Sequence, residues 1–344
     1  VDEYLCQWRK NERKTYLVEA DCPRFGTGEA KGIINASLRG HDTFIYVDPF
    51  NYGVTYNMYG MTVPMSPDDH FQDLKRIICA NEKKSRRVSV IMPMLYEGRQ
   101  HKRNARESLD CAMALQELVA MGVSNILTFD AHDPRVQNAI PNNGFDNVRT
   151  TYQMLKSLVR EFPDITFDPK QLMIISPDEG AMGRGMYCSS VLGLELGMFY
   201  KRRNYTVVIN GRNPIEAHEY LGNSVEGRDV IIIDDMISSG DSAIDVAREL
   251  KNRGARRIFM FATFGLFCNG CDNLDRAYEE GIITRIFTTN LNYRTQDIID
   301  RPWYTEVSLC KYVAYLIDTI NKDETISDLL NPVTRIHNLV DRVR

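Results

Sequence analysis

Two adjacent carboxylates, Asp234 and Asp235, precede a loop of small residues that runs from Ser238 to Ser242. The β-branched run Val230–Ile233 predicts a buried strand before them, and the apolar spacing after the loop predicts a helix that ends at Gly254. A helix N-terminus of this kind is suited to bind phosphate, and the carboxylates to bind sugar hydroxyls or a divalent cation. A strand–loop–helix unit without a ligand remains the alternative, because neither the P-loop pattern nor GxGxxG is present.

Two basic stretches are further candidates for phosphate chemistry. The segment from Arg99 to Ser108 is rich in Arg, Lys and His and nearly free of apolar residues. It predicts either a solvated loop or a mobile lid that closes over a polyphosphate. Three consecutive cations at 201–203 predict a surface patch unless a ligand is bound there.

Two polar residues follow predicted strands at the edge where α/β sites open. His132 comes after the predicted strand Asn125–Phe129, and Asp178 lies in a glycine-rich turn after the predicted strand Met173–Ile175. A histidine in this position is as often structural as it is a ligand, so the pattern alone leaves both readings open.

Alternating strand and helix patterns must position these residues. They form two similar blocks, each with ligand-type loops after strands, which indicates an α/β protein with two doubly wound parallel-sheet domains related by a pseudo-repeat. The predicted domains are residues 1–148, residues 149–305, and a C-terminal helix and tail, 306–344, that packs back on the N-terminal domain. No role is predicted for the last residues of this tail.

Composition narrows the function classes. The 344 residues carry a net charge of −4, which argues against non-specific nucleic-acid binding, and no apolar run has the length of a membrane span. Eight scattered cysteines and the lack of a signal-peptide pattern predict a cytoplasmic protein. Cys268 and Cys271 are the only cysteines close together in the sequence. Because neither a second pair nor a histidine lies nearby, a metal or redox protein is the least favoured alternative.

The stretch from Val230 to Ser242 resembles the phosphoribosyl-diphosphate (PRPP) loop of type I phosphoribosyltransferases and ribose-phosphate diphosphokinases. Asp241 stands where that loop usually has a second glycine, and we expect its side chain to point outward. Five other segments match the diphosphokinase family in order, over residues 24–330. RFGTGE resembles RFSDGE, and the stretch with Arg99 and Gln100 resembles YxRQDxK, with His101 in place of Asp. FDAHDPRVQ resembles DLHAxQIQ, and SPDEGAMGR resembles VSPDxGGxxRA. The KRR run at 201–203 also matches.

The resemblance implies a role for each matching residue. Phe25 and Glu29 would contact adenine, with Thr27 in place of the usual acid or amide. Arg99, Gln100 and His132 would bind ATP, and His132 and Asp178 would hold Mg²⁺. Lys201 and Arg203, with Arg99 and His132, would be catalytic. Asp234 and Asp235 would bind the ribose hydroxyls of ribose 5-phosphate, and its phosphate would be bound by Ser238, Ser239, Gly240, Asp241 and Ser242.

The implied fold is two domains of the type I phosphoribosyltransferase kind. The implied reaction is Mg²⁺-dependent transfer of the diphosphoryl group of ATP to ribose 5-phosphate, which gives PRPP and AMP. The implied assembly is a homo-oligomer, a dimer or hexamer, with neither nucleic acid nor membrane as a partner. A nucleobase phosphoribosyltransferase would share the PRPP loop without needing the adenine segment, and a non-catalytic regulatory homologue of the enzyme is the other alternative.

Overall fold

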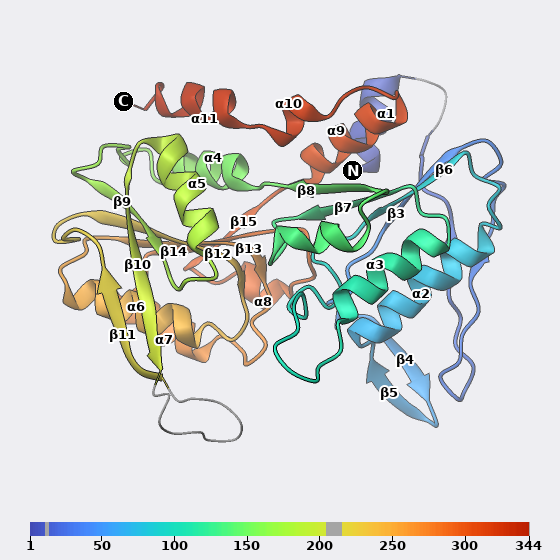
Figure 1. Cartoon of the computed structure of the whole chain (residues 1–344), viewed down its shortest axis with the longest axis horizontal. Coiled ribbons are helices and arrows are strands. Elements are labelled where there is room, and N and C mark those ends of the chain that lie inside the picture. The colour runs from blue at the N-terminus through green and yellow to red at the C-terminus, as the bar shows by residue number, and fades with distance from the viewer. Residues whose placement is uncertain (11–13, 204–214, 344) are drawn as a thin grey trace. The chain divides into compact units, whose positions relative to one another are not determined.

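The computed structural model describes residues 1–10, 14–203 and 215–343, without the side chains of 201–203 and 215–218 (Figure 1). Two compact units divide the chain. Unit 1 comprises Val1–Thr150, Asn290–Tyr293 and Ser308–Leu330, and unit 2 comprises Thr151–Thr289, Arg294–Val307 and Asn331–Arg344. The sequence predicted that the C-terminal helix and tail, 306–344, pack back on the N-terminal domain. In the structure Ser308–Leu330 belongs to unit 1, whereas Asn331–Arg344 belongs to unit 2.

Unit 1 is built on a parallel sheet with the strand order β3-β6-β7-β8. β7 has the bounds that the sequence predicted. Two small antiparallel hairpins, β1-β2 and β4-β5, belong to the same unit. The strands are β1 (Ala20–Asp21), β2 (Ile33–Ile34), β3 (Asp42–Tyr46), β4 (Thr55–Met58), β5 (Met61–Pro64), β6 (Arg87–Ile91), β7 (Asn125–Phe129) and β8 (Gly144–Val148).

Helices α2 and α3 bury their apolar faces in one core cluster with β6 and β7. Ser66 begins α2 with a capping box, in which its hydroxyl accepts from the backbone N–H of Asp69 and the Asp69 carboxylate accepts from that of Ser66. Gly122, at φ +95°, follows the end of α3, in the conformation typical of a glycine after a helix. The helices of unit 1 are α1 (Asp2–Arg9), α2 (Pro67–Ala80), α3 (Asp110–Ala120), the 3₁₀ helix η1 (Pro134–Ala139), α9 (Cys310–Asn321) and α10 (Ser327–Leu330).

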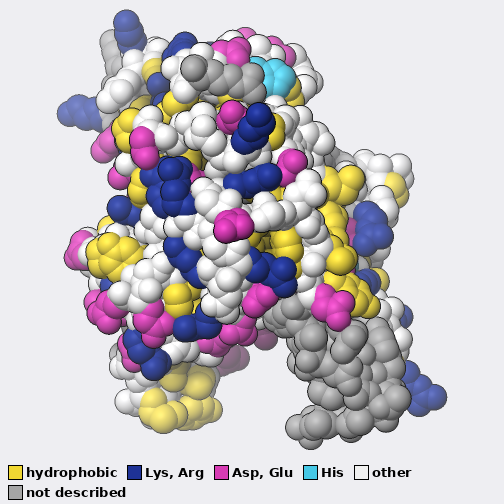
Figure 2. All heavy atoms as spheres, turned by 90° about the vertical axis from the view of Figure 1, so that its left-hand side faces the viewer, with side chains coloured by type: hydrophobic (Ala, Val, Ile, Leu, Met, Phe, Trp, Pro, Cys, Tyr) yellow, Lys and Arg dark blue, Asp and Glu magenta, His cyan; other side chains and the backbone are white. Residues whose placement is uncertain are grey.

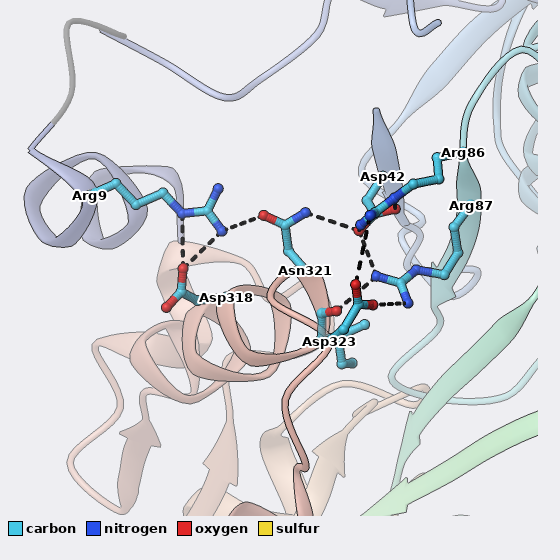
Figure 3. A network of polar contacts seen from close by, with 8 residues as sticks. Arg9, Asp42, Arg86, Arg87, Asp318, Asn321 and Asp323 are labelled. Carbon is cyan, nitrogen blue, oxygen red and sulfur yellow. Dashed lines mark hydrogen bonds and ion pairs between the residues drawn. The ribbon is translucent and has the colours of Figure 1, made fainter. Parts of the chain in front are cut away.

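A polar network centred on Asp42 joins the C-terminal helix α9 to β3 and β6 (Figure 3). The Asp42 side chain is 1% exposed and accepts from Arg86 (2.6 Å), Arg87 (2.6 Å) and Asn321 (3.0 Å). Asn321 also accepts from Arg9 at 2.8 Å, which adds α1 to the network. These contacts tie α9 to unit 1, although Asn321 lies 279 residues from Asp42 in the sequence.

We expect Asp42→Ala to lower the free energy of unfolding by about 3 kcal/mol, because it leaves two guanidinium groups without their buried partner. Burial acts to raise the pKa of Asp42, but hydrogen bonds from Arg86 and Arg87 outweigh it and hold the pKa well below the ordinary 3.8. The stabilisation is therefore fully present above pH 3.8 and is lost as the pH falls through the depressed value.

Urea unfolding between pH 7 and pH 2 measures both effects. The matched control is Asp323→Ala, which removes a 61% exposed carboxylate from Arg87 and should cost less than about 1 kcal/mol. Equal losses in the two variants would contradict the central role of Asp42. The difference between wild type and Asp42→Ala should also shrink at the acid end.

Unit 2 contains a seven-stranded sheet in the order β11-β10-β9-β12-β13-β14-β15. All pairs are parallel except β10-β11. The chain runs outward from β9 to β10 and then returns to place β12 on the other side of β9, so the strand order reverses between β9 and β12. The strands are β9 (Leu172–Ser176), β10 (Glu195–Arg203), β11 (Ile215–Leu221), β12 (Asp229–Ile237), β13 (Ile258–Gly265), β14 (Arg285–Thr289) and β15 (Tyr304–Val307).

The apolar run predicted as a buried strand lies inside β12, and the helix after it packs on the same core through Ile244, Ala247 and Leu250. The C-terminal tail forms α11, which packs against α4 and α5 and buries Ile336 completely. The helices of unit 2 are α4 (Thr151–Glu161), α5 (Met182–Leu192), α6 (Asp241–Asn252), α7 (Asp272–Glu279), α8 (Gln296–Ile299) and α11 (Val333–Val340).

The predicted α/β class with parallel sheets is confirmed by both units. Figure 2 shows Lys and Arg side chains interspersed with Asp and Glu on one face of the molecule, in keeping with the small net charge of −4. Among the helices described, none is long and apolar enough to cross a membrane.

Candidate active site

The reversal of strand order between β9 and β12 marks the candidate site of unit 2, because ligands of open α/β sheets bind at such switch points. Asp178 lies two residues beyond the end of β9, and Asp234 and Asp235 lie toward the carboxyl end of β12. Asp178, Asp234 and Ser242 line the same pocket. The structure thus brings together three predicted site residues that are up to 64 positions apart in sequence.

The small-residue loop leads directly into α6, as the sequence predicted. Gly240 is the N-cap residue of α6 and has a φ of +90°, a conformation that side chains disfavour. Asp241, the unexplained residue of the loop, is exposed and accepts a hydrogen bond from Asn273 of α7 at 2.9 Å. Its carboxylate is therefore held by α7, and its N–H donates to the Ser239 hydroxyl at 3.4 Å. The N–H groups in the first turn of a helix lack intrahelical partners, which makes this end of α6 a candidate for binding phosphate.

Gly240→Ala should destabilise the protein by about 1–2 kcal/mol and raise the KM for a phosphate-bearing substrate about tenfold. An added Cβ would lie 3.2 Å from the Leu274 side chain, so that side chain or the loop has to move by a few tenths of an ångström. Gly270→Ala is the matched control, because φ is +78° there and no atom lies within 4 Å of the added Cβ. Steady-state kinetics measure the KM of both variants. Equal KM values for Gly240→Ala and Gly270→Ala would show that the position of the Ser238–Ser242 loop does not matter for substrate binding.

The two carboxylates of β12 have different surroundings. Asp235 is 3% exposed, and its Oδ2 lies 3.9 Å from Nη2 of Arg184 on α5. Burial and the neighbouring charge of Asp235 raise the pKa of Asp234 well above its ordinary value, and the charge of Asp178 acts in the same direction. A site with this concentration of acidic groups favours a ligand rich in hydroxyl groups or a cation.

Arg184 is a site residue that the sequence analysis did not single out. It occupies the arginine position of the glycine-rich motif SPDEGAMGR, so the signal was present in the sequence. Its proximity to Asp235 depends on how α5 packs beside β9 and β12, which no local pattern reveals.

The chemistry of Asp178 fits a magnesium site of the kind that substrate completes. Mg²⁺ in proteins is bound by one or two carboxylates together with substrate phosphates and water. Asp178 is half-buried, and its Oδ1 accepts the backbone N–H of Ala181 at 3.2 Å, which fixes the carboxylate at the pocket. No group of three or more His, Cys, Asp or Glu that could hold a metal by itself occurs in the part of the chain that the structure describes.

His132, the other predicted metal ligand, lies in unit 1 just beyond β7. The backbone turns there: Asp130 has a φ of +44°, and the N–H of Ala131 donates to Oδ1 of Asn147 at 3.0 Å. This turn presents His132 at the carboxyl end of the parallel sheet, where the sequence predicted it.

The 97–109 loop, the basic segment between β6 and α3, also belongs to unit 1. Tyr96 precedes the loop; its hydroxyl donates to Asp68 at 2.6 Å and its ring stacks on Phe71. Arg99 is exposed, while Gln100 donates to the carbonyl of Ser108 at 2.7 Å. Of the predicted ATP-loop residues, Arg99 is therefore available to a ligand and Gln100 holds the loop together.

The predicted adenine segment forms a hairpin at the surface of unit 1. Phe25 is 55% exposed and pairs with Glu29 through the backbone at 2.7 Å. The Thr27 hydroxyl donates to the exposed Glu29 carboxylate at 2.9 Å. Thr27, which replaces the usual acid or amide of the motif, therefore orients Glu29. Arg24 holds the hairpin in place through a bidentate pair with Asp73, at 2.8 and 2.9 Å.

Lys201 and Arg203 lie in β10, where Lys201 is opposite His218 of β11. The side chains of both residues lie outside the described part of the chain, so their predicted catalytic role stays a prediction. Cys268 and Cys271 are both free thiols: Cys268 is exposed, and Cys271 is buried at the start of α7.

Two family models match the chain in succession. The N-terminal domain of ribose phosphate pyrophosphokinase matches residues 3–122, and the phosphoribosyl transferase domain matches residues 151–285. Together they span about three quarters of the chain. The first match covers most of unit 1, including the adenine segment and the 97–109 loop, and the second covers the switch-point site of unit 2.

Similar proteins carry the same description. Ribose-phosphate pyrophosphokinase of Vibrio parahaemolyticus is 28% identical over 92% of both chains, and that of Rhodopirellula baltica is 25% identical over 89% of this chain and 88% of the relative. The crystal structure of phosphoribosylpyrophosphate synthetase from Mycobacterium smegmatis has the same fold, with a TM-score of 0.75 and 19% identity, over 93% of this chain and 95% of the other. The chain therefore belongs to the ribose-phosphate pyrophosphokinase family.

Proposed function

We propose that this enzyme synthesises PRPP by transferring the diphosphoryl group of ATP to the anomeric hydroxyl of ribose 5-phosphate. The observation that carries the proposal is the switch-point site of unit 2, where Asp234 and Asp235 stand beside a loop that opens a helix. A helix N-terminus supplies N–H donors for the 5-phosphate, and the adjacent carboxylates are acceptors for the ribose hydroxyls.

In the reaction, the anomeric oxygen attacks the β-phosphorus of ATP. A new O–P bond forms, the bond between the β-phosphorus and the oxygen it shares with the α-phosphorus breaks, AMP leaves, and the hydroxyl proton is released. Such a transfer depends on positioning and on neutralising charge, not on a protein nucleophile. The loop Ser238–Ser242 and the acidic pair position ribose 5-phosphate, and Arg99, Lys201 and Arg203 neutralise the polyphosphate.

Phe25 and Glu29 are proposed to bind adenine, and Gln100 and His132 to bind ATP with Arg99. His132 and Asp178 are proposed to hold Mg²⁺, which would supply charge neutralisation on the phosphate oxygens when bound. The half-buried, backbone-fixed carboxylate of Asp178 supports this assignment on the side of unit 2.

We further propose that the protein is cytoplasmic and works as a homo-oligomer, a dimer or a hexamer. The eight free cysteines support a reducing compartment. The exposed ring of Phe25 in the adenine hairpin supports an adenine site that a second copy of the chain completes. Adenine stacked on this ring would need a further contact surface on its other face.

One assay tests the reaction: AMP formation from ATP, followed with and without ribose 5-phosphate and Mg²⁺. We expect AMP and PRPP in equal amounts when all three are present. PRPP consumption with a nucleobase, without need for ATP, would instead identify a nucleobase phosphoribosyltransferase. Binding of ribose 5-phosphate without turnover, under conditions in which a relative is active, would identify a non-catalytic homologue.

A further inference from the structure

In the 97–109 loop, one histidine is covered by the protein, although the residues that follow it are exposed. Residues 102–108 are all exposed, among them Lys102, Arg103 and Arg106. His101, which directly precedes them, has a side chain that is 12% exposed. A polar side chain is covered in this way when the surrounding structure gives it partners.

His101 lies against the polar residues that follow β7. Its ring centroid is 5.3 Å from that of His132, with the planes tilted by 56°. Its Nε2 lies 3.5 Å from Oδ2 of Asp133, whose side chain is 11% exposed. The loop and the carboxyl end of the sheet therefore meet at a covered contact between His101 and Asp133, beside the proposed ATP ligand His132.

Asp133 is a fixed partner for this contact. Its carboxylate caps η1 by accepting the backbone N–H of Arg135 at 2.9 Å, and it accepts from the Arg135 guanidinium at 2.5, 2.9 and 3.1 Å. The Arg135 side chain is 78% exposed, so it leaves the inner side of Asp133 to His101. A carboxylate with this many bonds cannot follow a moving loop, and the contact therefore sets the position of the loop.

Both members of the contact depart from the motifs of the sequence analysis. His101 stands where YxRQDxK has Asp, and Asp133 stands where DLHAxQIQ has Ala. An aspartate at 101 would face the charge of Asp133, whereas an imidazole can donate to it. The two departures are therefore complementary in this chain.

We propose that His101 is a positioning residue, whose contact with Asp133 holds the 97–109 loop beside His132 with its cations directed to the polyphosphate. This inference rests on the proposed function, because it takes ATP as the ligand of the loop. Holding the loop in place before the ligand arrives lowers the ordering cost of binding.

Four variants test the contact: His101→Ala, His101→Asp, Asp133→Ala and the double variant His101→Asp with Asp133→Ala. His101→Ala should raise the KM for ATP about three- to tenfold and change kcat less than about twofold. His101→Asp should be worse than His101→Ala because two carboxylates then face each other, and the double variant should recover most of the difference. His41→Ala, which changes an exposed histidine of the same unit, is the control.

Hydrogen exchange of the 97–109 loop measures the position of the loop without turnover. It should accelerate in His101→Ala and most in His101→Asp, while His41→Ala leaves it unchanged. Unchanged exchange in His101→Ala, or a double variant no better than His101→Asp, would overturn the proposal. If the wild type forms no AMP, the proposed function fails, and the exchange data still decide whether His101 holds the loop.

Discussion

Lys201→Ala is expected to lower kcat by about 10²- to 10³-fold with little change in stability, the scale for loss of one electrostatic donor in an active site. Negative charge spreads over the transferred group in the transition state of phosphoryl transfer, and a positioned ammonium group stabilises it there more than in the ground state. For this reason the loss should fall on kcat and not on the KM for either substrate.

Steady-state AMP formation measures the effect, and thermal unfolding checks that the fold is retained. Arg202→Ala is the matched control, because it removes an adjacent cation to which the family resemblance gives no role. Arg203→Ala should resemble Lys201→Ala. A kcat for Lys201→Ala within about threefold of wild type would remove Lys201 from the proposed mechanism.

Local patterns predicted the parts of the fold that depend on neighbours in sequence. β7 has the predicted bounds because its five residues are an apolar run between a helix-ending glycine and polar residues. Gly254 follows α6 as predicted, at φ +86°, since glycine adopts this conformation without strain. The order of strand, acidic pair, loop and helix around Asp234 was also predictable, because each of these elements depends on residues that are neighbours in sequence.

Contacts between distant segments were not predictable from such patterns. The contact of Arg184 with Asp235 and that of His101 with Asp133 each join residues about 30 to 50 positions apart, and both depend on how elements pack. The position of α9 in unit 1 depends on Asp42, whose sequence neighbourhood gives no sign of a partner near the C-terminus. Tertiary packing decides these cases, and periodicity carries no information about it.

The structure also separates residues of similar appearance in the sequence. Asp241 lies in the Ser238–Ser242 loop and Asp235 lies shortly before it, but Asp241 is exposed and held by Asn273, whereas Asp235 is buried near Arg184. A substitution at the buried acid should therefore affect substrate binding far more than one at the exposed acid.

Asp235→Asn is accordingly expected to raise the KM for ribose 5-phosphate about 10- to 100-fold, the value of one or two hydrogen bonds to a charged acceptor. The amide keeps the size of the side chain but loses the charge that faces Arg184 and that we propose binds ribose hydroxyls. The KM for ATP should change less than about threefold, because the proposed adenine and polyphosphate contacts do not include Asp235.

Kinetics with each substrate varied in turn separate these effects, and isothermal titration with ribose 5-phosphate measures binding without turnover. Asp272→Asn is the matched control, since this acid is exposed on α7 of the same unit. If Asp235→Asn raised the KM for ATP instead, the acidic pair would serve the nucleotide, and the ribose 5-phosphate assignment of the switch-point site would be wrong. A loss confined to the KM for ribose 5-phosphate would instead place the sugar between the acidic pair and the N-terminus of α6, because the 5-phosphate and the hydroxyls of one pentose have to be bound by neighbouring groups.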